Sequence, residues 1–294
     1  MTTPMDPQVG IYSHANGHVS DLLDRLAVSE ICKGWPVYRD ASEWKNFRSL
    51  FCEDAFVWTT WSKRQSVDNF IRVSKEGKAR GDFIMHRECG TSVDLNPETG
   101  RAVGKMKATI TQRFTIKGDT DRGVEPIAFD VDCDCRFHFF CFKQQGEYPQ
   151  WKIRYVKLIY EKDKVIPVDG KSVPTFSQEM LRRCPEGYQY LGAAQRMLGH
   201  DIDEFLPTIQ GKGKGAAHFL WIEMYEKMGQ WLEGADDIDL SSPAAHVGNG
   251  INGKAHRNGH ANGNGNGHVH IDVNANGHIH GHGNGNGFHA TPEY

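Results

Sequence analysis

An aspartate and a histidine, two residue types that together can move a proton, lie in neighbouring predicted elements. Asp40 lies in the segment Tyr-Arg-Asp-Ala-Ser-Glu-Trp between two predicted helices, and His86 lies near the start of a predicted strand. A carboxylate beside an imidazole holds its tautomer, raises its pKa and stabilises the imidazolium that forms on proton uptake. Such a pair needs no metal or cofactor to remove an acidic proton next to a carbonyl. The simpler alternatives are that Asp40 caps a helix and that His86 is a core histidine.

The segment 130–142 alternates between two faces with the period of a strand. One face is wholly apolar and is expected to pack against helices or a partner: Val131, Cys133, Cys135, Phe137, Phe139 and Cys141. The other face carries Asp132, Asp134, Arg136, His138, Phe140 and Phe142. Because polar and aromatic groups together are typical of ligand cavities, Arg136 and His138 are predicted to contact a ligand, with Tyr38 and Trp58 as further pocket residues. The alternative is a ladder of ion pairs on a solvated sheet face.

Motifs for metals and cofactors are weak or missing. Cys133 and Cys135 would lie on one face of a strand without the turn of a Cys-x-x-Cys knuckle, and no second cysteine pair follows. No Walker, Rossmann or Gly-x-Ser-x-Gly motif occurs, which argues against nucleotide and serine-hydrolase chemistry. We therefore predict no metal and no cofactor.

The elements that would position these residues follow from hydrophobic periodicity. Helical spacing predicts helices at 20–35, 42–52 and 66–76. Pro36 should kink or end the first of these helices. Period-two segments predict strands at 56–61, 83–95, 102–117, 128–143 and 150–163. The separators between the long strands are too short for crossover helices, so these strands are antiparallel. Helices followed by such a meander indicate an α+β fold.

Composition divides the chain into four parts. Residues 1–18 are a polar lead, 19–166 the main domain, and 167–240 a helical extension that serves as a lid or a dimer arm. Within 247–288, Gly, Asn and His make up 29 of 42 residues, so 241–294 is expected to be a disordered tail without a catalytic part.

Charge and cysteine content exclude several classes of protein. With 34 basic and 37 acidic residues, the net charge of −3 gives no general attraction to nucleic acid or anionic membranes. No apolar run approaches the roughly 18 residues that span a bilayer. The N-terminus lacks the features of a secretory signal, and the seven cysteines are an odd number. A cytoplasmic location with reduced thiols is the expectation.

Residues 20–163 resemble the SnoaL-like branch of the nuclear transport factor two-like superfamily. The shared features are Tyr-x-Asp at 38–40, the Trp-x-x-Phe-x-x-Leu-Phe helix at 44–51, the acidic-aromatic strand start at 53–56, and the strand-borne His86. The resemblance implies a cone: a strongly curved, mostly antiparallel sheet wrapped by N-terminal helices, with the ligand in the hollow. Within the superfamily, the nearest resemblance is to scytalone dehydratase and related lyases and isomerases.

In a residue-by-residue comparison with scytalone dehydratase, Asp40 and His86 match its catalytic aspartate and one of its catalytic histidines. Three features depart from its pattern. Arg39 replaces a tyrosine, Thr111 stands where a second histidine is expected, and Arg136 and His138 stand for a serine and an asparagine that face the pocket. Dehydration of scytalone itself is therefore not the prediction.

The resemblance implies a cofactor-free lyase or isomerase of the dehydratase type, with His86 as base and Asp40 as its orienting partner. The substrate would be a small aromatic or polyketide-type metabolite of secondary metabolism or aromatic degradation, and the protein a homodimer or homotrimer. One alternative is a non-catalytic module of the same fold that binds a ligand or a partner protein. Another is the small subunit of a ring-hydroxylating oxygenase, which would have a filled cone.

Overall fold

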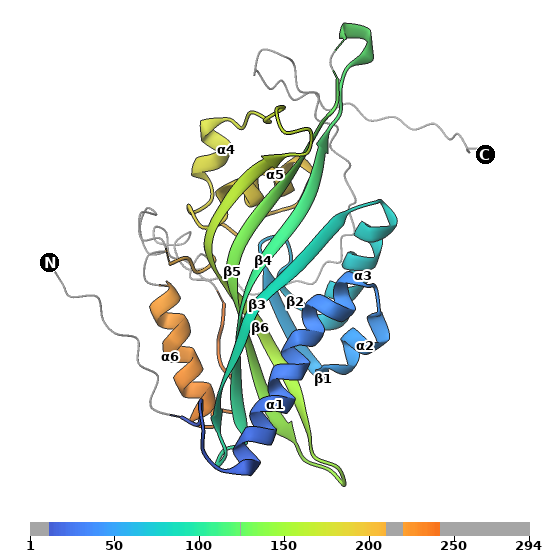
Figure 1. Ribbon diagram of the computed structural model, residues 1–294. Coiled ribbons are helices and arrows are strands. Elements are labelled where there is room, and N and C mark those ends of the chain that lie inside the picture. Colours follow the sequence, from blue (N-terminus) through green and yellow to red (C-terminus); the bar gives the residue numbers. More distant parts are fainter. Residues whose placement is uncertain (1–11, 124, 210–219, 242–294) are drawn as a thin grey trace, which may run out of the picture. The chain divides into compact units, whose positions relative to one another are not determined.

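One curved sheet of six strands organises the chain, in the order β2-β1-β6-β5-β4-β3 (Figure 1). The computed structural model describes residues 12–123, 125–209 and 220–241, so most of the predicted lead and nearly all of the predicted tail lie outside the described residues. Neighbouring strands are antiparallel except β1 and β6, which are parallel. The strands are β1 (Phe51–Thr59), β2 (Lys63–Ser66), β3 (Phe83–Asn96), β4 (Arg101–Ile116), β5 (Ile127–Gln144) and β6 (Gln150–Pro167). The predicted α+β fold with a mostly antiparallel sheet is confirmed.

The helices cover both faces of the sheet. They are α1 (Val19–Gly34), α2 (Trp44–Ser49), α3 (Val67–Ala79), α4 (Gln178–Arg182), α5 (Gln189–Met197) and α6 (Leu220–Leu232), with a short 3-10 turn at Thr120–Arg122. In Figure 1, α1, α2 and α3 lie on one side of the sheet and α6 lies on the other. None of the described helices has the length and apolar character needed to cross a bilayer.

Pro36 changes the geometry of the first helix without ending it. The chain continues through one π-helical turn, Trp35–Arg39, and the backbone N–H of Asp40 bonds back to the carbonyls of Pro36 and Val37. Proline lacks an N–H and crowds the preceding turn, and a widened turn accommodates both defects. Asp40 directly follows this turn, so the turn sets where its carboxylate lies.

Long-range pairing explains where the predicted element boundaries are wrong. The second helix ends at Ser49, and β1 begins at Phe51, five residues before the predicted start. The carbonyl of Leu50 accepts the N–H of Ile153 at 3.0 Å, so β6 draws this segment into the sheet. The short elements β2 and α4 were not predicted, because neither carries a periodic pattern of its own.

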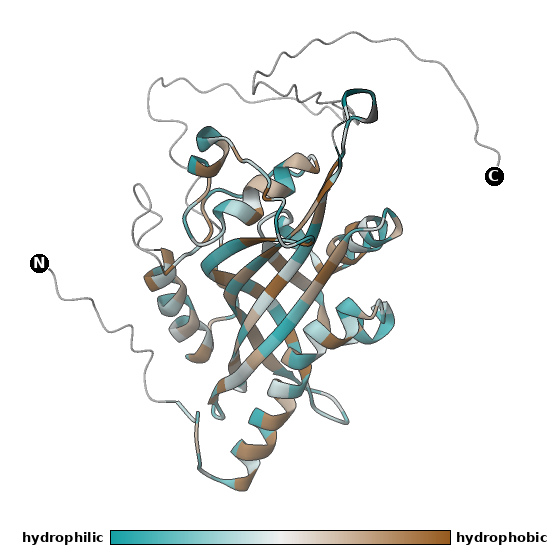
Figure 2. Ribbon diagram, turned by 45° about the horizontal axis from the view of Figure 1, so that its top comes forward, coloured by the Kyte–Doolittle hydropathy of each residue, from teal (hydrophilic) through white to brown (hydrophobic). Residues whose placement is uncertain are grey.

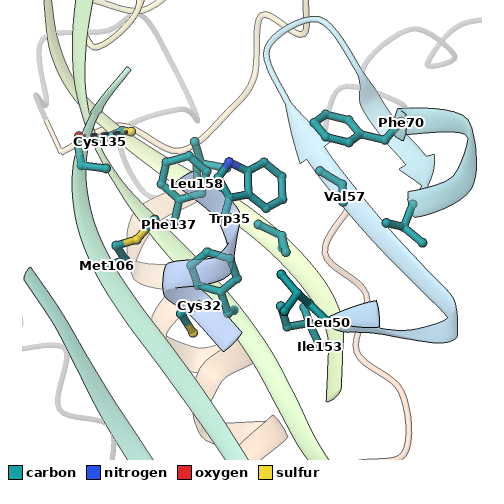
Figure 3. Close-up of a cluster of buried hydrophobic side chains, with 14 of the residues drawn as sticks. Cys32, Trp35, Leu50, Val57, Phe70, Met106, Cys135, Phe137, Ile153 and Leu158 are labelled. Carbon is teal, nitrogen blue, oxygen red and sulfur yellow. Dashed lines mark hydrogen bonds between the residues drawn. The ribbon is translucent and has the colours of Figure 1, made fainter. Parts of the chain in front are cut away.

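A large hydrophobic core lies between the sheet and the N-terminal helices. Trp35 is at its centre, 1% exposed, with its ring centroid 5.3 Å from those of Phe47 and Phe137 (Figure 3). Helix α1 crosses the sheet closely at Gly104, where an added Cβ would clash with Sγ of Cys32. The predicted burial of Phe47 and Leu50 against the sheet is confirmed, whereas Trp44 is only partly buried.

A second core lies on the opposite face of the sheet, beneath α6. Met224, Met228 and Trp231 of α6 are buried there, and the Trp231 indole N–H donates to the carbonyls of Ala102 at 3.2 Å and Cys141 at 3.0 Å. The predicted helical extension thus covers a sheet face of its own chain.

The first half of the predicted α1 stripe does not face the core. Leu22, Leu23 and Leu26 are 46%, 60% and 55% exposed, and Figure 2 shows hydrophobic segments along these outer turns. The helix extends past the edge of the sheet at this end, which periodicity along the helix could not show.

Candidate active site

Asp40 and His86 form a two-point contact. The His86 ring Nδ1 lies 2.8 Å from Oδ1 of Asp40, and the backbone N–H of His86 donates to Oδ2 at 2.6 Å. One residue therefore engages both oxygens of the carboxylate. With a neutral imidazole, this arrangement keeps the proton on Nδ1 and leaves the lone pair on Nε2.

Aromatic side chains enclose the other edge of the imidazole. The Trp35 indole N–H points at Nε2 of His86 across a long 3.4 Å, and the ring of Phe137 lies 5.8 Å away. The side chain of His86 is 3% exposed. The basic nitrogen thus lies in an apolar site that largely excludes water.

The pKa of His86 is shifted in the direction opposite to the one expected. Burial lowers it below its ordinary value, the hydrogen bond to Asp40 opposes this, and the positive charges of Arg39 and Lys78 lower it further. For Asp40, burial alone would raise the pKa, but the hydrogen bonds and charge of His86 and the charge of Arg39 outweigh it and lower the pKa. At neutral pH the pair is therefore a neutral imidazole beside a carboxylate.

Two cationic side chains flank Asp40. Arg39 is 3% exposed, its guanidinium carbon lies 5.5 Å from the ring centroid of Phe70, and Nη1 is 3.6 Å from Oδ1 of Asp40. Lys78 donates to the backbone carbonyl of Asp40. Sequence reasoning noted Arg39 only as a departure from the family pattern, because nothing in the local sequence indicates that its charge is buried.

A hollow of about 30 Å³, room for one or two water molecules, adjoins this pair. Its wall includes Arg39, which precedes Asp40, and Ile84, which lies two residues before His86 on the same strand face. Neither Asp40 nor His86 lines the hollow itself. The remaining wall is Trp61, Val73, Ser74, Gly77, Lys78, Arg80, Asp82, Gln112 and His200.

The other predicted pocket residues are not brought to this hollow. Trp58 packs under α6 in the second core, and His138, fully buried, faces the ring of Tyr225 at 6.2 Å. Arg136 pairs with Glu161, as in the alternative of an ion-pair ladder. Tyr38 lies on the correct side of the sheet but packs, partly buried, against the main core.

Strand alternation identified the two faces of β5, and Arg136 and His138 lie on the face turned away from this hollow. The apolar face with Phe137 packs in the main core and adjoins His86, whereas α6 covers the face of His138. Thr111 is also on the outer face, where its hydroxyl donates to Asp132. The residue opposite His86 on β4 is Ile110.

Helical spacing could have identified Ser74, a residue in the wall of the hollow that the sequence analysis does not name. Ser74 lies four residues after Phe70 and seven after Val67, on the buried side of α3. Gln112, Trp61 and His200 come from three distant segments, and only the folded chain brings them together.

Comparison with known proteins places the chain in a family. Residues 20–157 match the model of the SnoaL-like domain. The chain is 47% identical to Pea pathogenicity protein 2 of Fusarium vanettenii over 60% of this chain and 71% of that protein. It is 42% identical to a PEP2-like protein of the same organism, over 74% of this chain and 90% of that one.

Among solved structures, a putative scytalone dehydratase from Novosphingobium aromaticivorans is similar at 16% identity and a TM-score of 0.38, covering 53% of this chain and 93% of that one. Given the domain match and these two relatives, the chain belongs to the SnoaL-like family.

Proposed function

We propose that the protein is a cofactor-free lyase or isomerase that removes a proton next to a carbonyl of a small aromatic or polyketide-type metabolite. The observation that carries this proposal is the two-point contact of His86 with Asp40 beside a hollow. Membership of the SnoaL-like family supports it.

In this proposal Nε2 of His86 takes the proton. The electron pair of the broken C–H bond moves to the carbonyl oxygen and forms an enolate, while Asp40 stabilises the new imidazolium. Expulsion of a leaving group completes a lyase reaction, and return of the proton at another carbon completes an isomerisation. The Trp35 indole, 3.4 Å from Nε2, has to release this nitrogen before substrate reaches it.

The alternative is a module of the same fold that binds a ligand or a partner without catalysis. Two observations favour it: the hollow has room for only one or two water molecules, and Nε2 already has a neighbour in Trp35. The partner-binding form of this alternative would use the exposed leucines of α1.

Several further proposals about this protein do not depend on the dyad. They are a main domain at 19–166 with an extension at 167–240, a homodimer or homotrimer, a cytoplasmic location, and a role in secondary metabolism or aromatic degradation. Sedimentation of the full chain measures the oligomeric state directly.

Solvent deuterium exchange separates the enzyme from the binding module. A panel of aromatic ketones and polyketide-type enols is incubated with the protein in D₂O, and uptake at the α-carbon is followed by mass spectrometry. For a ketone that the wild type exchanges, His86→Ala should slow exchange by roughly 10²–10⁴-fold. The exposed His18 provides a matched control, and His18→Ala should leave the rate unchanged. Equal exchange by wild type and His86→Ala would leave only the binding module.

A further inference from the structure

Arg39 carries a buried charge whose Nε and Nη1 lack hydrogen-bond acceptors. No described residue accepts a hydrogen bond from its Nε or Nη1, both of which are shielded from solvent. A guanidinium stays protonated in proteins, and a buried charge without acceptors is costly. The ring of Phe70 interacts with the cation but offers no acceptor for the N–H groups.

Asp40 does not accept a hydrogen bond from Nε or Nη1 of Arg39. Its two oxygens accept from the ring and the backbone of His86, and Nη1 of Arg39 remains 3.6 Å from the nearer one, beyond hydrogen-bonding distance. The guanidinium is therefore attracted to the charge of this carboxylate across 3.6 Å without donating an ordinary hydrogen bond to it. Its free N–H groups need another acceptor.

A second unpartnered donor lines the same hollow. The hydroxyl of Ser74 on α3 is buried and has no hydrogen-bond partner among the described residues. The wall also contains Lys78, Arg80 and one carboxylate, Asp82. Three cations face one carboxylate there, and counting Asp40 beside the hollow still leaves one positive charge in excess.

From these observations we infer that the hollow is an oxyanion site, in which Arg39 and Ser74 hold a carboxylate, or an equivalent acidic oxygen, of the ligand. Its volume of about 30 Å³ suits such a group, and the rest of the ligand extends toward the partly exposed Trp61 and His200. The substrate class is thus narrowed to small acids and acidic enols or phenols. Calling this ligand the substrate rests on the proposed function, whereas the anion site does not require the dyad to be catalytic.

Binding of small carboxylic acids and of their neutral amides tests the proposed oxyanion site. Acetate, benzoate and phenylacetate are compared with their neutral amides, by calorimetry and by the shift in melting temperature. The acids should bind and the amides should not. Arg39→Met should weaken binding of the acids roughly 10–100-fold, because it removes charge-assisted hydrogen bonds, and Ser74→Ala should weaken it less. Exposed Arg182 on α4 is the matched control, and Arg182→Met should bind as the wild type does.

Stability gives a second readout that a purely structural arginine would not give. Without any acid, Arg39→Met should melt at a higher temperature than the wild type, because buried N–H groups without acceptors are replaced by an apolar chain, while Asp40 keeps both of its hydrogen bonds from His86. The His86 imidazole, followed by NMR, should titrate at higher pH in Arg39→Met, since the positive charge of Arg39 lowers its pKa.

The outcomes separate this inference from the proposed function. Binding of the acids to His86→Asn with the wild-type affinity supports the anion site, whether or not that variant has lost deuterium exchange. Three results overturn the inference: no acid binds the wild type, the acids bind Arg39→Met equally well, or Arg39→Met is destabilised while acid binding persists.

Discussion

The stability of the protein should depend on pH through Asp163 in β6. One oxygen of its carboxyl accepts the backbone N–H of Leu191 in the first turn of α5 at 2.8 Å, and the other, Oδ1, is buried without a partner among the described residues. Burial raises the pKa of this carboxyl from 3.8 to about 7, against the hydrogen bonds from the α5 backbone that lower it. The folded state therefore holds a proton that the unfolded chain releases near pH 4.

The sign and size follow from this difference. Because the folded pKa lies above the unfolded one, the stabilising contribution is complete below about pH 4 and is lost as the pH rises toward 7. About three pKa units at 1.36 kcal/mol each give an upper bound of about 4 kcal/mol. Since Asp163 is partly exposed, we expect about half of this bound.

Urea unfolding of the wild type and of Asp163→Asn at pH 5, 6, 7 and 8 measures this effect. The variant keeps a neutral acceptor for the Leu191 N–H, so its free energy of unfolding should exceed the wild-type value by an amount that grows with pH and levels off above 7. The control Asp121→Asn, at an exposed position, should give a difference that does not change with pH. A pH-independent difference for Asp163→Asn would refute the reasoning.

Three further predictions concern the two faces of the sheet. Trp231→Ala should lower the free energy of unfolding by about 3–5 kcal/mol in urea, because it empties a fully buried site, and Trp231→Phe should cost less. Burial lowers the pKa of His138 to about 3, so the free energy of unfolding should fall by up to about 1.4 kcal/mol per pH unit below pH 6.5. His138→Phe should flatten this pH dependence, and an unchanged pH dependence would exclude the effect. If His86 and Asp40 act in one step, the double variant should exchange deuterium little more slowly than the worse single one, and additive losses would contradict this.

The sequence by itself indicated the long elements, and the family resemblance added the pairing of Asp40 with His86. Period-two segments marked the four long strands, and the helical stripe located α1. The Tyr-x-Asp feature ending at Asp40 and the strand-borne His86 named the pair that the structure joins at 2.8 Å. These features are local, because side-chain period and element type are set within a few residues of chain.

The tertiary structure alone decided which face of each element encloses the hollow. Alternation separates the faces of β5 but does not say which face the N-terminal helices cover, and His138 lies on the face that α6 covers. The register between β3 and β4 sets Ile110, and not Thr111, opposite His86. Arg39 is buried without acceptors for Nε and Nη1 where the π-helical turn, α3 and the sheet meet. Such a meeting depends on contacts between segments far apart in sequence, which no local pattern specifies.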